Sequence, residues 1–314
     1  MVYNAYSLKE VANRPERLSA GHRMCSGCGS PIAVRAVMRA LHPEDKAVVS
    51  VATSCLEVST MTYPYTSWED SYIHTAFENT AATASGVEAA YKAKKAKGKL
   101  DGTWKIIAFG GDGGTYDIGF QSLSGAMERG TDMVYVCYDN EAYMNTGIQR
   151  SSSTPLYADT TTSAIGPMSD GKPQYKKDLT VIMAAHRIPY VAQTTFIGNF
   201  KDLHQKAEKA IYTQGPAFMN IMAPCPRGWR YDESILMELC KVAVETCVWP
   251  LYEVVDGEWT LNYEPKNKLP VTEYLKLQGR FSHLLKPGNE ELLERIQDDV
   301  DQRWEELKYR CNAV

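Results

Sequence analysis

The chain has 314 residues, of which 44% are hydrophobic and 23% charged, and its formal net charge is −4. A chain of this length can bury a large core without disulfide crosslinks, and its mild acidity gives no electrostatic reason to expect binding to nucleic acid or to a membrane surface. Residues 1–18 contain no apolar segment typical of a signal peptide, and no apolar run approaches the roughly 18 residues of a membrane-spanning helix. We therefore expect a cytoplasmic protein.

Short apolar runs alternate with helical patterns from residue 31 to residue 246. The predicted strands, rich in β-branched and aromatic residues, are 46–53, 104–111, 133–139, 190–196 and 217–223. The predicted helices are 31–41, 78–97, 119–129, 178–187, 200–213 and 232–246. This alternation predicts an α/β fold with a doubly wound, mainly parallel sheet.

Two segments break the alternation. Residues 150–177 are rich in Ser, Thr, Gly and Pro, and loops of that length are usually functional or disordered. From residue 249 onward the pattern is that of a hairpin followed by an arm. We therefore divide the chain into a site-bearing domain, 1–248, and a C-terminal hairpin and arm, 249–314, that packs on this domain or on a partner.

Polar or thiol residues directly follow four of the predicted strands. These residues are Ser54 and Cys55, Asp112 and Gly113, Asn140, and Pro224 and Cys225. Ligands of open parallel sheets bind outside the carboxyl ends of the strands. Four strands that bring such residues to one edge therefore predict a site there.

The glycine-rich segment 110–117, GGDGGTYD, joins a predicted strand to a predicted helix. Such turns commonly bind phosphate, but this one contains a carboxylate, Asp112, and fits neither G-x-G-x-x-G nor the P-loop. Asp112 and Asn140 end strands joined by one crossover, so we expect them to be neighbours. Their side-chain oxygens and a backbone carbonyl suit a divalent cation that binds a diphosphate. The alternative, for this loop alone, is a tight turn in which Asp112 caps the helix.

Eight cysteines are present, and in a cytosolic chain they are more often metal ligands or buried thiols than disulfides. Cys25 and Cys28 form a C-x-x-C motif, which alone is ambiguous between zinc, redox and iron–sulfur sites. Cys55 and Cys225 add two thiols at the predicted sheet edge, and four thiolates can hold a 4Fe–4S cluster. The others are expected to be buried structural thiols: Cys137, Cys240, Cys247 and Cys311.

Several segments together resemble the catalytic β subunit of the 2-oxoacid:ferredoxin oxidoreductases. GDG at 111–113, followed by Asn140 in DNEAYMNTG, matches the thiamine diphosphate motif. The other matching segments are HRMCSGCGSP, SCLEVSTMTYPYTSW, AFENTAATASGVEAA, MAAHRIPYV and APCPRGW. The segment YEPKNKLPVTEYLKLQGRF extends the similarity to about residue 281. The resemblance implies the thiamine diphosphate-binding type of α/β fold.

The resemblance also implies roles for the matching residues. Mg²⁺ would be held by the side chains of Asp112 and Asn140 and the backbone oxygen of Ala142. Asn145, which in isolation reads as an Asx turn in a loop, would face the thiazolium and the substrate as the catalytic residue. The other cofactor-binding positions are Gly111, Gly113, Gly114, Thr146, Ser54 and Glu57. The 4Fe–4S cluster closest to thiamine would be held by Cys25, Cys28, Cys55 and Cys225.

The same family obtains the glutamate that activates thiamine from a partner chain or domain. We expect that none of the acids near the motifs takes this role here, namely Glu57, Glu69, Asp70 and Glu78. The isolated chain should then be inactive, within a hetero-oligomer whose other subunits supply this glutamate and carry further 4Fe–4S clusters. Those clusters would pass the electrons from a small 2-oxoacid to ferredoxin.

Three local departures bear on the choice of 2-oxoacid. Glu69-Asp70 follows PYTSW, the loop 163–175 is long, and Arg227 stands in CPRGW. These features most resemble the oxalate-oxidising member, which releases two CO₂ without coenzyme A. Pyruvate, converted to acetyl-CoA and CO₂, is the alternative. A non-catalytic iron–sulfur subunit is disfavoured by Asp112, Asn140 and Asn145, and a thiamine decarboxylase without a cluster is disfavoured by the four thiols.

Overall fold

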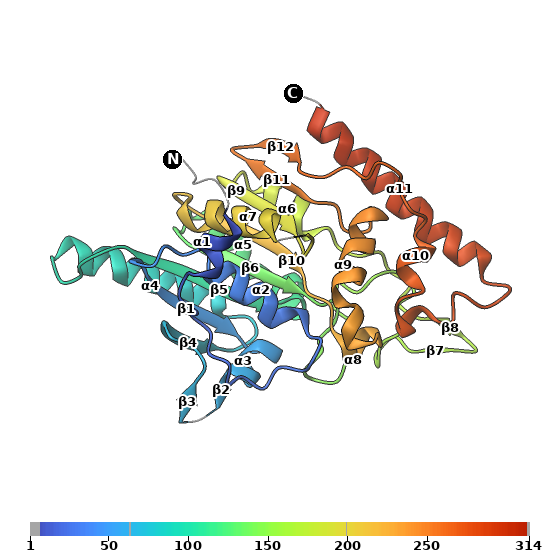
Figure 1. Ribbon diagram of the computed structural model, residues 1–314, viewed down its shortest axis with the longest axis horizontal. Helices are drawn as coiled ribbons and strands as arrows, with labels where there is room; N and C mark the ends of the chain where they lie inside the picture. Colours follow the sequence, from blue (N-terminus) through green and yellow to red (C-terminus); the bar gives the residue numbers. More distant parts are fainter. Residues whose placement is uncertain (1–6, 63, 199, 313–314) are drawn as a thin grey trace.

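The computed structural model describes residues 7–62, 64–198 and 200–312, and within them an eight-stranded sheet forms the centre (Figure 1). Six neighbouring strands run parallel, in the order β9 (Tyr190–Thr194), β10 (Ala217–Met222), β6 (Val134–Asp139), β5 (Trp104–Gly111), β1 (Lys46–Ala52) and β4 (Ser71–Thr75). The antiparallel hairpin β11 (Tyr252–Val255) and β12 (Glu258–Leu261) continues the sheet beyond β9. The mainly parallel α/β fold that the sequence predicts is confirmed.

Helices cover the sheet through their apolar faces. The helix α4 (Thr80–Ala96) packs on β1, β5 and α5 (Phe120–Glu128), while α7 (Lys201–Tyr212) packs on β9, β10 and α2 (Gly29–Met38). The buried residues of α7 recur at helical spacing, which explains its docking: Leu203, Ala207, Ala210 and Ile211. The remaining helices that contribute to the domain are α1 (Leu8–Ala12), α3 (Cys55–Thr60), α6 (Leu179–Ala185), α8 (Pro226–Trp229) and α9 (Leu236–Glu245).

The five predicted strands and six predicted helices are all present, with ends shifted by a few residues. The helix expected at 119–129 is α5, and a π-helical turn, Gly113–Ile118, that was not predicted precedes it. Several elements were not predicted, among them β4, α3 and the C-terminal helix α11 (Glu290–Asn312). β4 is a five-residue strand at the sheet edge with only one buried residue, so its sequence lacks the apolar run of the central strands.

The C-terminal region forms one end of the molecule. Its hairpin pairs with β9, so Tyr252 lies opposite Gln193, and α11 packs against β12. Figure 1 shows α11 running beside α9 and α10 (Thr272–Leu275) at the opposite end from the β2–β3 hairpin (Met61–Thr62 and Tyr65–Thr66). The division of the chain at residue 248 remains a prediction.

The segment 150–177 has little regular structure but is well packed. Its exposed tip is the small hairpin β7 (Ile165–Gly166) and β8 (Ser169–Asp170), whereas residues 153 and 154 are completely buried. Two 3-10 turns, Glu233–Ile235 and Gly279–Phe281, complete the structure. None of the helices in the described ranges is both long and apolar enough to span a membrane.

Candidate active site

A cleft opens at the carboxyl ends of β1, β5 and β6. Its lining residues come from four separate parts of the chain: Thr53, Ser54, Cys55, Phe77, Gly111, Gly113, Gly114, Tyr138, Asn140, Ala142, Tyr143, Met144, Asn145 and Thr146. Nine of the residues predicted from sequence are among them. The structure therefore brings together, at one sheet edge, the glycine turn, the Asn140 loop and one of the four predicted cluster cysteines.

The glycine turn is shaped by close neighbours. A Cβ on Gly113 would lie 2.4 Å from the Tyr143 ring, and a Cβ on Gly114 would lie 2.9 Å from the Phe77 carbonyl oxygen. The Tyr143 hydroxyl donates to the Gly113 carbonyl at 2.8 Å, which ties the turn to the Asn140 loop. Only glycine fits both positions, so the backbone is left accessible on the cleft side.

Three oxygen-bearing groups converge next to this turn. With its amide oriented to satisfy its neighbours, the Asn140 side-chain nitrogen donates to Asp112 Oδ1 at 2.8 Å and to the Ala142 carbonyl oxygen at 2.9 Å. The Asn140 amide is thus within hydrogen-bonding distance of the two other predicted ligands of a divalent cation. Rotation of the amide would present its oxygen to a cation, so the donor set fits a hard ion such as Mg²⁺.

The charges buried behind the cleft do not balance. Asp112, Asp139 and Glu141 are buried carboxylates, and the cations that face them are Lys176 and Arg280. Burial, and then the neighbouring Asp139, raises the pKa of Asp112 well above its ordinary value. One carboxylate therefore lacks a compensating cation among the described neighbours, and a divalent ion at Asp112 would supply the missing positive charge.

Four consecutive residues hold the acids of the site in place. The hydroxyls of Ser151, Ser152 and Ser153 donate to Asp112, Asp117 and Asp139, respectively. The Thr154 hydroxyl donates to the Glu141 carbonyl at 2.6 Å. The 150–177 loop, expected from its length and composition to be functional or disordered, therefore supports the site through its Ser-Ser-Ser-Thr run.

The four cysteines predicted to hold a cluster lie in one region. Cys28 and Cys225 precede α2 and α8, and Cys55 begins α3. Burial, with a further contribution from neighbouring thiols of this set, raises the pKa of Cys28 to about 11 and that of Cys55 to about 12. Among the described residues, no three His, Cys, Asp or Glu side chains are arranged to hold a single metal ion. The thiolates of a 4Fe–4S cluster are separated by the width of the cube.

Hydrogen-bond donors surround these sulfurs, as expected around cluster ligands. The backbone N–H of Ser30 bonds the Cys28 sulfur, and those of Arg227 and Gly228 bond the Cys225 sulfur. The Asn145 side chain bonds the Cys55 thiol, so the predicted catalytic residue touches a predicted cluster ligand. The donor set fits an iron–sulfur cluster next to the cleft.

Other residues singled out from the sequence do not line the cleft. Glu57 is not among the cleft residues: it is buried on α3 with one carboxylate oxygen 3.0 Å from His74 Nδ1. Burial outweighs His74 and raises the pKa of Glu57. Asp70 forms an ion pair with Arg17 at 2.7 Å. Of the cysteines expected to be buried, Cys137, Cys240 and Cys247 are, whereas Cys311 is only partly buried.

The cleft is not the largest hollow of the molecule. It encloses about 20 Å³, and several other hollows are larger; one of them, of about 190 Å³, lies under α11 and is lined by residues such as Trp249, Arg303 and Trp304. The larger enclosed volume and the groups suited to bind a cofactor therefore lie in different places. We favour the cleft, because the glycine turn, the cation-binding groups and the Cys55 thiol lie in it or directly beside it.

Comparisons with known proteins agree with this site. Residues 50–221 match the family model described as thiamine pyrophosphate enzyme, C-terminal TPP binding domain. The chain is 52% identical over 309 residues to the pyruvate synthase subunit PorB of Thermotoga maritima, covering 96% of this chain and 95% of the relative. It is 51% identical to PorB of Methanocaldococcus jannaschii, covering 92% and 96%. It is 43% identical to the ketoisovalerate oxidoreductase subunit VorB of Pyrococcus furiosus, covering 93% of each chain.

A solved structure shares the fold. It is the 2-oxoglutarate:ferredoxin oxidoreductase from Magnetococcus marinus, with a TM-score of 0.55 and 22% identity, covering 72% of this chain and 79% of that one. At this identity the likeness concerns the fold alone. The sequence relatives match nearly end to end, and by them the chain belongs to the 2-oxoacid:ferredoxin oxidoreductase family, among its β subunits with a thiamine pyrophosphate-binding domain.

Proposed function

We propose that this chain is the thiamine diphosphate-binding subunit of a pyruvate:ferredoxin oxidoreductase. The complex would convert pyruvate, coenzyme A and two oxidised ferredoxins into acetyl-CoA, CO₂, a proton and two reduced ferredoxins. The observation that supports it most directly is the convergence of Asp112, Asn140 and Ala142 beside Asn145 and Cys55. The printed names of the relatives, pyruvate synthase subunits at about half identity, support pyruvate as the substrate.

The expectation of oxalate has no support among these relatives. It depended on Glu69-Asp70, the loop 163–175 and Arg227, and none of these residues lines the cleft. Asp70 instead pairs with Arg17, and the 163–175 loop contains the exposed β7–β8 hairpin. Because none of these departures lines the cleft, they are weak indicators of substrate, and pyruvate replaces oxalate as the main proposal.

Each group of the site would then have a distinct task. Asp112, Asn140 and Ala142 would hold Mg²⁺, and the glycine turn would leave room for the diphosphate. Bound thiamine supplies an electron sink for the electrons left by the departure of CO₂. Asn145 would orient the substrate, and the cluster on Cys25, Cys28, Cys55 and Cys225 would accept electrons one at a time.

The chain would depend on a partner for the activating glutamate. Among the described residues that line the cleft there is no carboxylate, and Glu57 faces His74 instead. The enclosed volume of about 20 Å³ is also small compared with the ~300–1,000 Å³ of typical ligand pockets, as half of a shared site would be. A partner subunit would supply the facing half, and ferredoxin would receive the electrons.

A substrate comparison on the anaerobically purified complex tests the proposal. Reduction of a viologen dye should depend on both pyruvate and coenzyme A. Oxalate, assayed without coenzyme A, should give less than a tenth of that rate. Faster reduction with oxalate would restore the oxalate assignment, and faster reduction with 3-methyl-2-oxobutanoate would place the chain with its ketoisovalerate-oxidising relatives instead.

A further inference from the structure

Glu141 has an unusual backbone at the centre of the predicted cation site. It lies between Asn140 and Ala142, and its φ of 65° is in the left-handed region that residues other than glycine seldom adopt. This conformation allows the flanking Asn140 amide and Ala142 carbonyl to approach each other while the Glu141 side chain is buried behind them. Such strain persists only where surrounding contacts impose it.

The Glu141 carboxylate is anchored from two sides. Oε1 lies 2.8 Å from Lys176 Nζ, and Oε2 forms an ion pair with Arg280. The Glu141 side chain is almost completely buried, so these two cations are the partners that compensate its charge. Arg280 belongs to the 3-10 turn Gly279–Phe281 of the C-terminal arm, far from Glu141 in sequence.

Arg280 contacts the same loop by a second route. Its guanidinium stacks on the Trp229 ring at 4.0 Å, and the Trp229 indole Nε1 donates to the Asn140 carbonyl at 2.7 Å. Arg280 Nε also donates to Gln278 at 2.9 Å, which fixes the guanidinium in its plane. Arg280, a residue of the arm, therefore contacts Glu141 directly and is linked to Asn140 through Trp229.

We propose that Arg280 is a positioning residue: the C-terminal arm, through Arg280, holds Glu141 and Trp229 so that the Asn140 amide and the Ala142 carbonyl oxygen are preset for the cation. The inference rests on the proposed thiamine diphosphate and Mg²⁺ site. It assigns the arm a task in cofactor binding in addition to packing. Partners behind metal ligands commonly change metal affinity 10- to 100-fold.

The test is Mg²⁺-dependent retention of thiamine diphosphate, measured by equilibrium dialysis of the full complex. In Arg280→Gln and Glu141→Gln, the Mg²⁺ concentration for half-maximal retention should rise about 10- to 100-fold. Saturating Mg²⁺ should restore the wild-type cofactor stoichiometry, because the ligands themselves are intact.

Two further variants refine the test. Arg280→Lys, which keeps the charge, should recover part of the Mg²⁺ affinity. In the double variant Arg280→Gln, Glu141→Gln, the Mg²⁺ concentration for half-maximal retention should not exceed that of the more strongly affected single variant.

Arg17→Gln is the matched control. Arg17 is a buried arginine whose ion pair with Asp70 precedes β4, away from the carboxyl ends of the strands where the cleft opens. Its loss should lower thermal stability without changing the Mg²⁺ requirement. An equal rise in Arg17→Gln, or no rise in both Arg280→Gln and Glu141→Gln, would overturn the inference.

Glu141→Gly separates the effect of the carboxylate, which anchors the loop to Arg280, from the effect of the left-handed backbone at residue 141. It also provides a test if the other variants fold poorly. Glycine adopts a φ of 65° without strain but has no carboxylate for Arg280. The anchoring role predicts weakened Mg²⁺ binding in this variant, and wild-type binding would contradict it. If the wild-type complex itself retained no thiamine diphosphate, or retained it independently of Mg²⁺, the proposed function would fail instead.

Discussion

Asp112 is the residue on which the cation site depends. It is fully buried, and its carboxylate contacts Asn140 and Ser151. We expect Asp112→Ala to reduce thiamine diphosphate retention at least 100-fold, because the cation that neutralises the diphosphate loses an anionic ligand. Cofactor released on denaturation and iron–sulfur absorbance, measured on the same sample, check this. Loss of the cluster with thiamine retained would contradict the role of Asp112.

The same carboxylate should destabilise the chain when no cation is present. Because burial and Asp139 raise the pKa of Asp112, the native state keeps a proton that the unfolded chain releases. This contribution to stability is complete below the ordinary carboxyl pKa and is lost as pH rises through the raised native pKa. Without Mg²⁺, at neutral pH, Asp112→Asn should therefore melt higher than the wild type, by roughly 2–4 °C for each kcal/mol gained.

Thermal unfolding of the metal-free chain between pH 4 and pH 8 checks this second prediction. The difference between Asp112→Asn and the wild type should grow as pH rises, and adding Mg²⁺ with thiamine diphosphate should stabilise only the wild type. A difference that does not vary with pH would mean that Asp112 does not carry the uncompensated charge. Asp139, which bonds Tyr116 and Lys176, already has its partners and is not the residue at issue.

At the scale of elements, one buried lysine joins the two ends of the loop 150–177 to each other. Lys172 Nζ donates to the carbonyl oxygens of Ser152 and Thr154, on the run that bonds the site's acids. Burial, with Arg150 and Lys176 nearby, lowers the pKa of Lys172 to about 8. Between that pH and the ordinary lysine pKa, the unfolded chain binds more protons, so this group makes stability rise with pH.

Lys172→Met should therefore cost about 1–3 kcal/mol at pH 7, since buried carbonyl groups lose their donor. The rise in stability above about pH 8 should disappear in the variant. Urea unfolding of the wild type and of Lys172→Met at pH 7 and pH 9.5 measures both the loss of stability and its pH dependence. Lys176 is unchanged in both proteins. Equal pH dependence in the two proteins would show that Lys172 is ionised normally.

The helices and strands differ in how well they could be predicted from the sequence. Central strands such as β6 and β10 are buried along their whole length, so their apolar runs are distinctive. The residues that follow them, Asn140 and Cys225, could be assigned to one edge by the rule for parallel sheets. The helix α11 was missed although its buried residues recur at helical spacing, because its exposed face is strongly charged: Ile296, Val300, Trp304 and Leu307.

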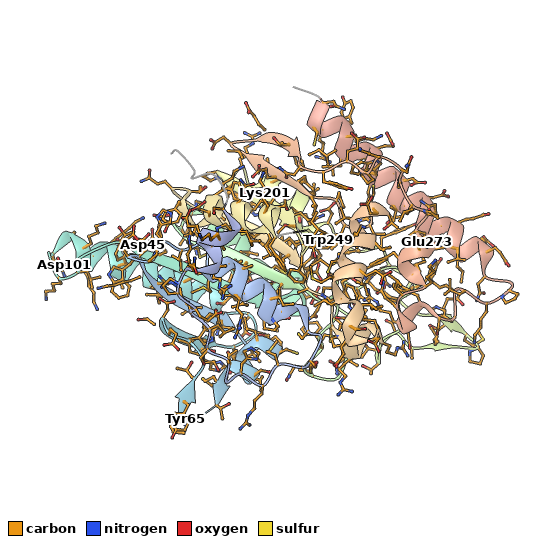
Figure 2. The ribbon with its side chains drawn as sticks, viewed as in Figure 1. Asp45, Tyr65, Asp101, Lys201, Trp249 and Glu273 are labelled. Atoms are coloured by element: carbon orange, nitrogen blue, oxygen red, sulfur yellow. The ribbon has the colours of Figure 1, made fainter. Side chains whose placement is uncertain are left out.

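The contacts behind the site could not be predicted from the pattern. Lys176 and Arg280 meet at Glu141 from segments far apart in sequence, and nothing local in either segment indicates the other. Trp249, labelled in Figure 2, has the Lys176 ammonium 4.6 Å from the centre of its ring. Such contacts depend on tertiary packing, which residue periodicity does not encode.

At the scale of the whole molecule, the cleft and its surroundings have the features of one half of a shared site. Val58 on α3 and Tyr65 on β3 expose apolar side chains just beyond Cys55, and Figure 2 shows Tyr65 projecting from the end of its hairpin. Exposed apolar surface next to polar functional groups is typical of interaction sites. We infer that a partner subunit covers this region.

The isolated chain should consequently bind cofactor weakly and be inactive. Loaded with its cluster, Mg²⁺ and thiamine diphosphate, it should show no pyruvate-dependent viologen reduction, because no carboxylate from the described cleft residues can activate thiamine. Adding the partner subunits should restore turnover and tighten cofactor binding at least 10-fold. Tyr65→Asp should weaken that restoration, since a buried unpaired charge at the interface is costly, while Asp101→Asn, a change at an exposed position remote from the cleft, should not. Turnover by the isolated chain at the rate of the complex would place the activating carboxylate within this chain.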